Sequence, residues 1–232
     1  MKLSSVSFSW PDGPCIAADF SLSIAPGSIT VLVGASGCGK STILRLLAGL
    51  LTPESGSVSA PLSSRAFVFQ SPNLLPWLSA LDNVALPLKL SGLDATTRRE
   101  QAREALGRVG LADASSSLPR ALSGGMRMRV SLARALVTQP ALLLMDEPFS
   151  SLDALTRRQM HTEFLSLTES LSTTVVMVTH DLEEAVLLGD RVVVLAGQPV
   201  TIAEDTTLTT PRPRDRHAPA VVALVAALEG AL

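Results

Sequence analysis

The stretch VLVGASGCGKST, Val31 to Thr42, decides the fold class of this 232-residue chain. A run of apolar, β-branched residues leads into a glycine-rich turn, and a new segment begins with Lys40. The spacing matches the pattern G-x-x-x-x-G-K-[ST], which joins a strand to a helix through a loop that wraps phosphate groups. We therefore expect an α/β fold that binds a nucleotide at this loop.

The residue types in this loop suit phosphate chemistry. The glycines allow backbone N–H groups to approach the phosphates, and the start of the following helix adds its dipole. We expect Lys40 to reach the β- and γ-phosphates and Ser41 to ligate Mg²⁺. The alternative is a chance glycine-rich turn, which would not need every fixed position of the pattern. The predicted phosphate loop consists of Gly34, Ala35, Ser36, Gly37, Cys38, Gly39, Lys40, Ser41 and Thr42.

Two carboxylates end the apolar run LLLMDEP, residues 142–148. In open α/β sheets, ligands bind at the carboxyl ends of the strands. We expect Asp146 to hold Mg²⁺ through water and Glu147 to act as the general base. His180 ends another apolar run, VVMVTH, and is a candidate contact to the γ-phosphate. Alone, these residues fit a solvated turn and a surface histidine, but a phosphate loop in the same chain favours the catalytic interpretation.

A second serine- and glycine-containing segment, ALSGGMRMRVSLARAL, occupies residues 121–136. Ser123 offers a hydroxyl group, and Gly124 and Gly125 allow close backbone approach at the start of a predicted long helix. These features are typical of an anion-binding site. The chain therefore carries two predicted phosphate-binding segments.

The order of the predicted elements indicates one domain, residues 1–232, built from several parts. Residues 1–70 read as short strands and one helix, residues 71–139 as helices, and the following segments alternate between strand and helix. Such alternation predicts a parallel sheet with crossover helices. We assign residues 1–70 and 140–207 to a nucleotide-binding core, 71–139 to an inserted helical subdomain, and 208–232 to a surface tail that closes with a short helix.

The composition argues against several classes of protein. The net charge is −2, which disfavours binding to nucleic acid. No secretory pattern occurs at the start of the sequence, so we expect the chain to lie in the cytosol. Its two cysteines, Cys15 and Cys38, should therefore stay reduced. No apolar run is long enough to span a bilayer. The guanine-reading pattern N-K-x-D is absent from the sequence, which argues against a GTP-dependent switch.

The order and spacing of these motifs resemble the ATP-binding subunits of ABC transporters over nearly the full chain. The phosphate loop resembles the Walker A motif, and LLLMDEP resembles Walker B. LSGGM, residues 122–126, is similar to the signature motif, and SSLD, residues 150–153, to the D-loop. The resemblance makes Gln70 the Q-loop glutamine and His180 the switch histidine.

The resemblance implies a role for each of these residues. It makes Glu147, His180 and Gln70 catalytic, and it assigns Mg²⁺ to Ser41, Gln70 and Asp146. Trp10 stands where the family usually places an aromatic ring that stacks on adenine, although a lone Trp can equally be a core residue. The predicted contacts to ATP, beyond the phosphate loop, are those of Trp10, Ser123, Gly124, Gly125 and Asp153.

The resemblance also implies a fold and an assembly. The fold is a RecA-like P-loop NTPase core with an N-terminal antiparallel β-subdomain and the inserted helical subdomain. The assembly is a homodimer that sandwiches two ATP molecules, so that the signature segment of one subunit caps the γ-phosphate bound by the other. Met126 departs from the usual signature glutamine, which affects secondary contacts rather than the phosphate-facing ones.

Within the family, the sequence looks most like the ATPases of nitrate, sulfonate and taurine importers. That likeness implies import of a small oxyanion or organic acid, membrane permease subunits that dock near Gln70 to Leu78, and an external solute-binding protein. It places the chain at the cytoplasmic face of the inner membrane. The alternatives are an ATPase that regulates an envelope complex and one that acts on DNA or ribosomes. Only 52 residues, 71–122, separate Gln70 from Ser123, which leaves no room for the long coiled coil of DNA-repair relatives.

Overall fold

The computed structural model describes residues 1–61, 64–169 and 171–231, and the chain divides into two compact units. The first unit comprises Met1–Arg65, Leu144–Glu147 and Thr174–Leu232. The second comprises Ala66–Leu143 and Pro148–Thr173. The domain boundaries expected after residues 70, 139 and 207 stay a prediction.

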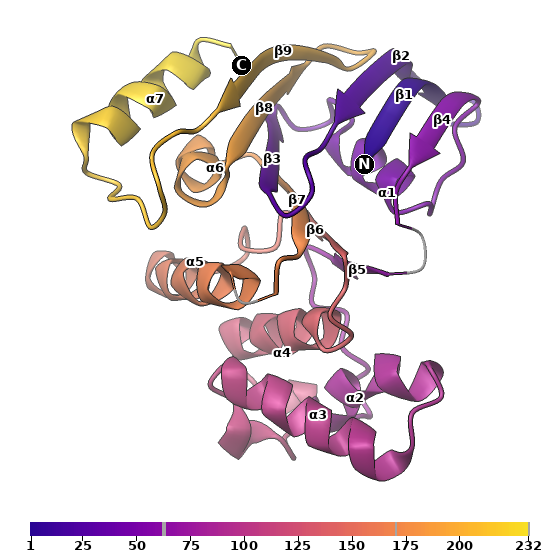
Figure 1. Cartoon of the computed structure of the whole chain (residues 1–232), viewed down its shortest axis with the longest axis vertical. Coiled ribbons are helices and arrows are strands. Elements are labelled where there is room, and N and C mark those ends of the chain that lie inside the picture. Colours follow the sequence, from indigo (N-terminus) through magenta and orange to yellow (C-terminus); the bar gives the residue numbers. More distant parts are fainter. Residues whose placement is uncertain (62–63, 170, 232) are drawn as a thin grey trace. The chain divides into compact units, whose positions relative to one another are not determined.

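A three-stranded antiparallel sheet opens the first unit (Figure 1). Its strands are β1 (Lys2–Ser9), β2 (Cys15–Ser23) and β4 (Ser55–Ser59), in the order β2-β1-β4. Leu3, Val6 and Phe8 of β1 are buried, and a register shift between Leu3 and Val6 keeps them on the face that packs on a core. This sheet matches the antiparallel β-subdomain that the sequence resemblance implied.

The parallel strands of the first unit are almost completely buried. β3 (Ile29–Gly34) lies between β7 (Thr174–Thr179) and β8 (Arg191–Ala196), parallel to both. These strands are runs of apolar, mostly β-branched residues. Such runs are typical of a parallel sheet, whose two faces are both covered by helices. β9 (Thr201–Thr207), which the sequence did not suggest, pairs antiparallel with β8, and its mostly exposed residues mark it as an edge strand.

Three helices belong to the first unit. α1 (Lys40–Leu47) follows β3, α6 (Leu182–Leu188) joins β7 to β8, and α7 (Pro219–Glu229) closes the chain. The short helix expected near the end of the sequence corresponds to α7. The last residues of β6 (Leu142–Asp146) also belong to this unit, where β6 neighbours β7.

The second unit is mainly helical, as expected for residues 71–139. It contains α2 (Ala80–Leu90), α3 (Ala95–Arg108) and α4 (Gly124–Leu136), two short 3₁₀ turns at Ala112–Ala114 and Pro119–Ala121, and α5 (Ala154–Glu169). β5 (Arg65–Val68) neighbours β6. Helices α2, α3 and α4 pack against one another (Figure 1).

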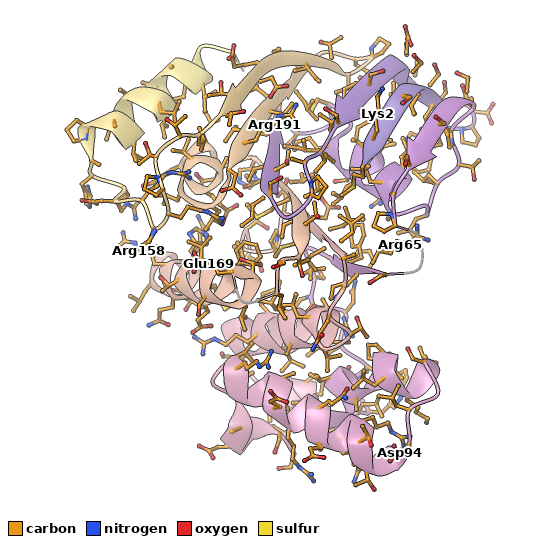
Figure 2. All side chains as sticks on the ribbon, in the orientation of Figure 1. Lys2, Arg65, Asp94, Arg158, Glu169 and Arg191 are labelled. Carbon is orange, nitrogen blue, oxygen red and sulfur yellow. The ribbon has the colours of Figure 1, made fainter. Side chains whose placement is uncertain are left out.

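Side-chain caps set where these helices begin. Ser79 accepts a hydrogen bond from the Asp82 N–H at the start of α2, and Asp94, labelled in Figure 2, accepts bonds from Thr96 and Thr97 at the start of α3. Such caps satisfy N–H groups that have no partner inside the helix. Gly110 has a φ of 67° just beyond α3, the left-handed conformation that commonly ends a helix.

Two expectations about membrane and redox setting can be compared with the fold. Within residues 1–61, 64–169 and 171–231, no helix has the length and apolar character needed to cross a bilayer. Cys15 is exposed and Cys38 is buried, and both are free thiols.

Candidate active site

The phosphate loop connects the buried end of β3 to the start of α1. Lys40, only 5% exposed, donates hydrogen bonds from Nζ to the carbonyl oxygens of Gly34 and Ala35, at 2.7 and 2.9 Å. The lysine side chain therefore spans the loop and fixes its curvature. Gly39 precedes α1 without any side-chain cap, so the first N–H groups of the helix are available to an anion.

Two glycines of the loop are required by close packing. A Cβ atom on Gly34 would lie 2.3 Å from the carbonyl oxygen of Leu195 on the neighbouring strand. Gly39 has a φ of 109°, and its Cβ would lie 2.6 Å from Cγ2 of Ile16 in β2. A larger residue at Gly34 would collide with the backbone of Leu195. A larger residue at Gly39 would collide with Ile16 and would also have to adopt a φ that L side chains rarely adopt.

Ser41 and Asp146 form the oxygen pair expected for a metal site. Oγ of Ser41 donates a hydrogen bond to Oδ1 of Asp146 at 2.8 Å, and Asp146 is only 9% exposed at the end of β6. Hydroxyl and carboxylate oxygens are hard ligands that suit Mg²⁺, which usually keeps water and phosphate oxygens as its other ligands. The described residues contain no group of three or more His, Cys, Asp and Glu side chains that could hold a metal by themselves. The pair therefore fits Mg²⁺ that arrives with a nucleotide.

Glu147 and His180 meet because β6 and β7 are neighbouring strands. Oε2 of Glu147 lies 3.0 Å from Nδ1 of His180, and the Glu147 N–H donates to the carbonyl oxygen of Val178. Glu147 has a φ of 44°, a left-handed conformation that is strained for a residue with a long side chain. Strain of this kind persists where the surrounding structure fixes the side chain for a task.

Trp10 lies in the turn between β1 and β2. Its ring packs edge-on against Phe8, with ring centroids 5.3 Å apart, and its backbone bonds to Pro14 and Gly13 close the turn. The ring is half-buried rather than part of the core. Because Ile16 of the same hairpin lies against Gly39, the hairpin that carries Trp10 contacts the phosphate loop.

The remaining predicted site residues belong to the second unit. Gln70 donates from Nε2 to Oγ of Ser150 at 3.2 Å, so the Q-loop glutamine is held by the D-loop segment. Ser123 caps α4 by accepting a hydrogen bond from the Met126 N–H at 3.2 Å. Asp153 caps α5 by accepting bonds from Leu155 and Thr156. Hydrogen bonds from the Thr156 side chain and backbone lower the pKa of the Asp153 carboxyl.

The signature segment and the D-loop helix pack closely within this unit. A Cβ on Gly125 would lie 2.6 Å from Cγ2 of Thr156, so only glycine lets the start of α4 approach α5 this closely. Ser123 and Gly124 are exposed beside this contact. Met128, 1% exposed, is a core residue of α4, whereas Met126 is half-buried.

Sequence reasoning missed two residues that organise the segment after Gln70. Asn83 is completely buried and bonds to backbone atoms of Leu75, Leu78 and Ser79. Arg134 donates to the carbonyl oxygens of Pro72 and Asn73, at 2.8 and 2.9 Å. Burial lowers the pKa of the Arg134 guanidinium. A polar residue on the apolar face of α2 was the available signal for Asn83.

The structure thus gathers Lys40, Ser41, Asp146, Glu147 and His180 in the first unit. A phosphate loop, an oxygen pair for a metal, and a glutamate beside a histidine define a P-loop nucleoside triphosphatase. The model of the ABC transporter family matches residues 17–150. The chain belongs to the ABC transporter family, as an ATP-binding subunit whose ATP hydrolysis is coupled to transport.

Curated relatives agree with this assignment. The chain is 47% identical over 213 residues to the aliphatic sulfonates import ATP-binding protein SsuB 1 of Xanthomonas axonopodis pv. citri, covering 88% of this chain and 84% of that one. It is 42% identical over 223 residues to the nitrate import ATP-binding protein NrtD of Synechococcus elongatus, covering 91% and 81%.

Solved structures agree on the fold. The ATP-binding cassette MJ0796, in a dimeric post-hydrolysis state bound to ADP and Pi, superposes with a TM-score of 0.80 at 31% identity, covering 90% of this chain and 99% of that one. A second dimeric structure of MJ0796, a bacterial ABC transporter cassette, gives a TM-score of 0.80 at 30% identity, with the same coverage. The expected fold, a P-loop NTPase with an antiparallel β-subdomain and added helices, is confirmed.

Proposed function

We propose that this chain drives the import of a small oxyanion or organic acid, with aliphatic sulfonates, taurine and nitrate as the substrate class. The relatives at 47% and 42% identity, named for sulfonate and nitrate import, support this class. The transported solute is chosen by other subunits, so the cassette itself supplies ATP-driven work.

The pairing of Glu147 with His180 beside the Ser41–Asp146 pair carries the catalytic part of the proposal. Glu147 accepts a proton from the attacking water, and His180 orients the Glu147 carboxylate through their 3.0 Å contact. Lys40 holds the loop whose N–H groups bind the β- and γ-phosphates, with the adenine stacked on Trp10. Gln70 would orient water and would serve as a further ligand of the metal. Mg²⁺, bound by Ser41 and Asp146 together with the phosphates, would neutralise charge that develops during phosphoryl transfer.

A homodimer completes the proposed site. Ser123 and Gly124 are exposed at the start of α4, Gly125 is half-buried against Thr156, and Asp153 begins α5 close beside them. In the proposed dimer these residues cap the γ-phosphate bound by the phosphate loop of the partner, and two-fold symmetry creates two such sites. The dimeric state of both similar cassettes supports this arrangement.

The segment from Gln70 to Leu78 is the proposed docking site for membrane permease subunits. Trp77 is 72% exposed, which argues against the alternative that it packs inside the helical unit. Asn83 and Arg134 fix the backbone of this segment, so that Trp77 is presented on a rigid support. An exposed aromatic residue on a fixed backbone is typical of an interface anchor. We place the assembly at the cytoplasmic face of the inner membrane, with an external solute-binding protein that delivers the substrate.

Reconstitution tests the proposal. The chain is combined with the membrane subunits that copurify with it and with a solute-binding protein, and uptake of labelled taurine, an alkanesulfonate and nitrate into proteoliposomes is measured. We expect ATP-dependent uptake of at least one of these solutes, and no uptake with Glu147→Gln. ATP hydrolysis without uptake of any of them would contradict the substrate class but not the site assignment.

A further inference from the structure

Helix α6 connects the candidate active site to the C-terminal tail. His180 lies two residues before its start, and Asp181 caps it by accepting a hydrogen bond from the Glu184 N–H at 3.1 Å. The helix is only seven residues long, and helices this short depend on capping and packing for their stability. Whatever holds α6 in place therefore contributes to the placement of His180.

The carboxyl end of α6 does not use the left-handed glycine cap that is common at helix ends. Gly189 has a φ of −74° and a ψ of 151°, so its backbone is extended there. Its N–H bonds to the carbonyl oxygen of Ala185, but the later carbonyls of a helix have no partner within it.

Arginines of the tail donate hydrogen bonds to carbonyl oxygens at this end of α6. Nη1 of Arg214 donates to the carbonyl oxygens of Val186 and Gly189, at 2.7 and 2.6 Å. Nη1 of Arg212 donates to the carbonyl oxygen of Leu188 at 3.3 Å. A cation at this end of a helix is also favoured by the helix dipole.

The arginines are themselves fixed. Arg214 donates from Nε and Nη2 to the carbonyl oxygen of Thr210, which closes a tight turn in the tail. Arg212 forms an ion pair with Asp190 at 3.1 Å. Burial lowers the pKa of the Arg214 guanidinium, and the nearby charge of Arg212 acts in the same direction.

A third arginine reaches the other end of α6. Nη2 of Arg216 lies 2.5 Å from Oε2 of Glu183, in the first turn of the helix. His180, Glu183 and Arg216 line one hollow of about 650 Å³, whose far wall is formed by Val221 and Val225 of α7. Helices α6 and α7 also pack against each other (Figure 1). The tail thus holds both ends of α6.

We propose that Arg214, assisted by Arg212 and Arg216, is a positioning residue that holds α6 so that His180 meets Glu147. The proposal rests on the proposed catalytic role of His180. The guanidinium group suits this task because one planar fork reaches three backbone carbonyls, which a lysine cannot do. The arginine-rich tail then acts on ATP hydrolysis without touching the nucleotide.

Arg214→Ala tests the proposal. Because small misplacements of a catalytic group are costly, we expect kcat for ATP to fall by about tenfold and KM to change less than about twofold. The chain has three histidines, so the ring signals of His180 can be assigned by NMR with His161→Gln and His217→Gln variants. In Arg214→Ala, the His180 signal should shift toward that of a solvated histidine. Arg214→Lys, which keeps the charge but loses the fork, should give an intermediate kcat.

Arg191→Ala is the matched control. Arg191, labelled in Figure 2, forms a two-pronged ion pair with Asp205 and donates to the carbonyl oxygen of Ser23, so its hydrogen bonds within the described residues go to β9 and β2. Both Arg191→Ala and Arg214→Ala should lower the melting temperature, but Arg191→Ala should leave kcat and the His180 signal unchanged. Equal losses of kcat in the two variants would overturn the proposal, because a general loss of stability would then explain both.

Combining variants separates this proposal from the proposed function. If Arg214 acts through His180, Arg214→Ala should change kcat less than about twofold in a His180→Ala background. A persistent tenfold loss there overturns the positioning role. Unchanged kcat in His180→Ala alone would instead refute the catalytic role of His180 and the present proposal with it. If kcat falls in His180→Ala but is unchanged in Arg214→Ala, only the positioning role is refuted.

Should Arg214→Ala fail to fold, Arg216→Ala and Glu183→Gln allow the same measurements at the first turn of α6.

Discussion

Nδ1 of His180 lies 3.0 Å from Oε2 of Glu147, although the two residues are 33 positions apart in the chain. Each residue follows a buried strand, and the two strands are neighbours in the sheet. The left-handed backbone of Glu147 and its N–H bond to Val178 direct the carboxylate toward this contact. The general base proposed here is therefore fixed by the end of β7 as well as by its own strand.

Glu147→Gln should nearly abolish ATP hydrolysis and leave ATP binding intact, because the side chain keeps its size and loses the charge that accepts a proton. General-base catalysis typically contributes about 10²- to 10⁴-fold, which sets the expected loss of kcat. Steady-state hydrolysis and ATP binding by calorimetry measure the two effects. Gel filtration with ATP should find this variant as a dimer. Hydrolysis at the wild-type rate would show that the base is another group.

Trp10→Ala should weaken ATP binding by roughly 1 to 3 kcal/mol, the range for a base stacked on an aromatic side chain. In a Trp77→Phe background, the remaining Trp10 fluorescence should change when ATP binds. The converse variant, Trp10→Phe, should show no direct change in Trp77 emission. Since stacking contacts no base edge, GTP should bind within about tenfold of ATP. Strict discrimination against GTP would count against adenine stacking on Trp10.

Asn83→Ala should destabilise the second unit, because Asn83 makes four hydrogen bonds from a fully buried position. The loss removes the side-chain partner of half-buried backbone groups of Leu75 and Leu78, at a cost of about 1 to 3 kcal/mol for an unsatisfied group. Urea denaturation measures the change. Gln101→Ala, at an exposed position on α3, should stay within about 0.5 kcal/mol of wild type. Equal stability of both variants would refute the role assigned to Asn83.

Trp77→Glu should uncouple transport from ATP hydrolysis, because a charge replaces the exposed ring at the proposed permease contact. In proteoliposomes we expect uptake to fall by at least about tenfold while the isolated subunit hydrolyses ATP normally. Leu90→Glu is the control, since Leu90 is 80% exposed at the end of α2, outside the Gln70–Leu78 segment. A fully active transporter that carries Trp77→Glu would exclude this residue from the interface.

Mixing two inactive variants tests the composite site of the proposed homodimer. Lys40→Ala removes the lysine of the phosphate loop, and Ser123→Arg places a bulky cation at the start of α4. Each homodimer should be inactive. A mixed dimer, however, contains one site with an intact loop and an intact signature segment. Random pairing makes half of the dimers mixed, so activity should return to at most about a quarter of wild type. No recovery, with mixed dimers demonstrated by affinity tags, would mean that the two segments do not share a nucleotide.

The sequence by itself determined the local features of this protein. The phosphate loop from Gly34 to Thr42, the buried strands and the helix stop at Gly110 all depend on residues that are close together in the chain. Their form follows from local rules: glycine permits close approach or a positive φ, and β-branched runs suit a parallel sheet covered on both faces. The motif order also indicated the family, which the comparisons confirmed.

Only the tertiary structure decided which distant side chains meet. Ser41 bonds to Asp146 across 105 residues, and His180 meets Glu147, because the strand order of the sheet brings those strand ends together. Asn83 and Arg214 act on backbone carbonyls and N–H groups, whose partners no residue pattern records, since every residue carries the same backbone. The sequence PRPRDR, residues 211–216, predicts only a surface segment, because the backbone groups that its arginines contact cannot be seen in the sequence. Its arginines satisfy carbonyls that become unpaired only when α6 ends in extended backbone at Gly189.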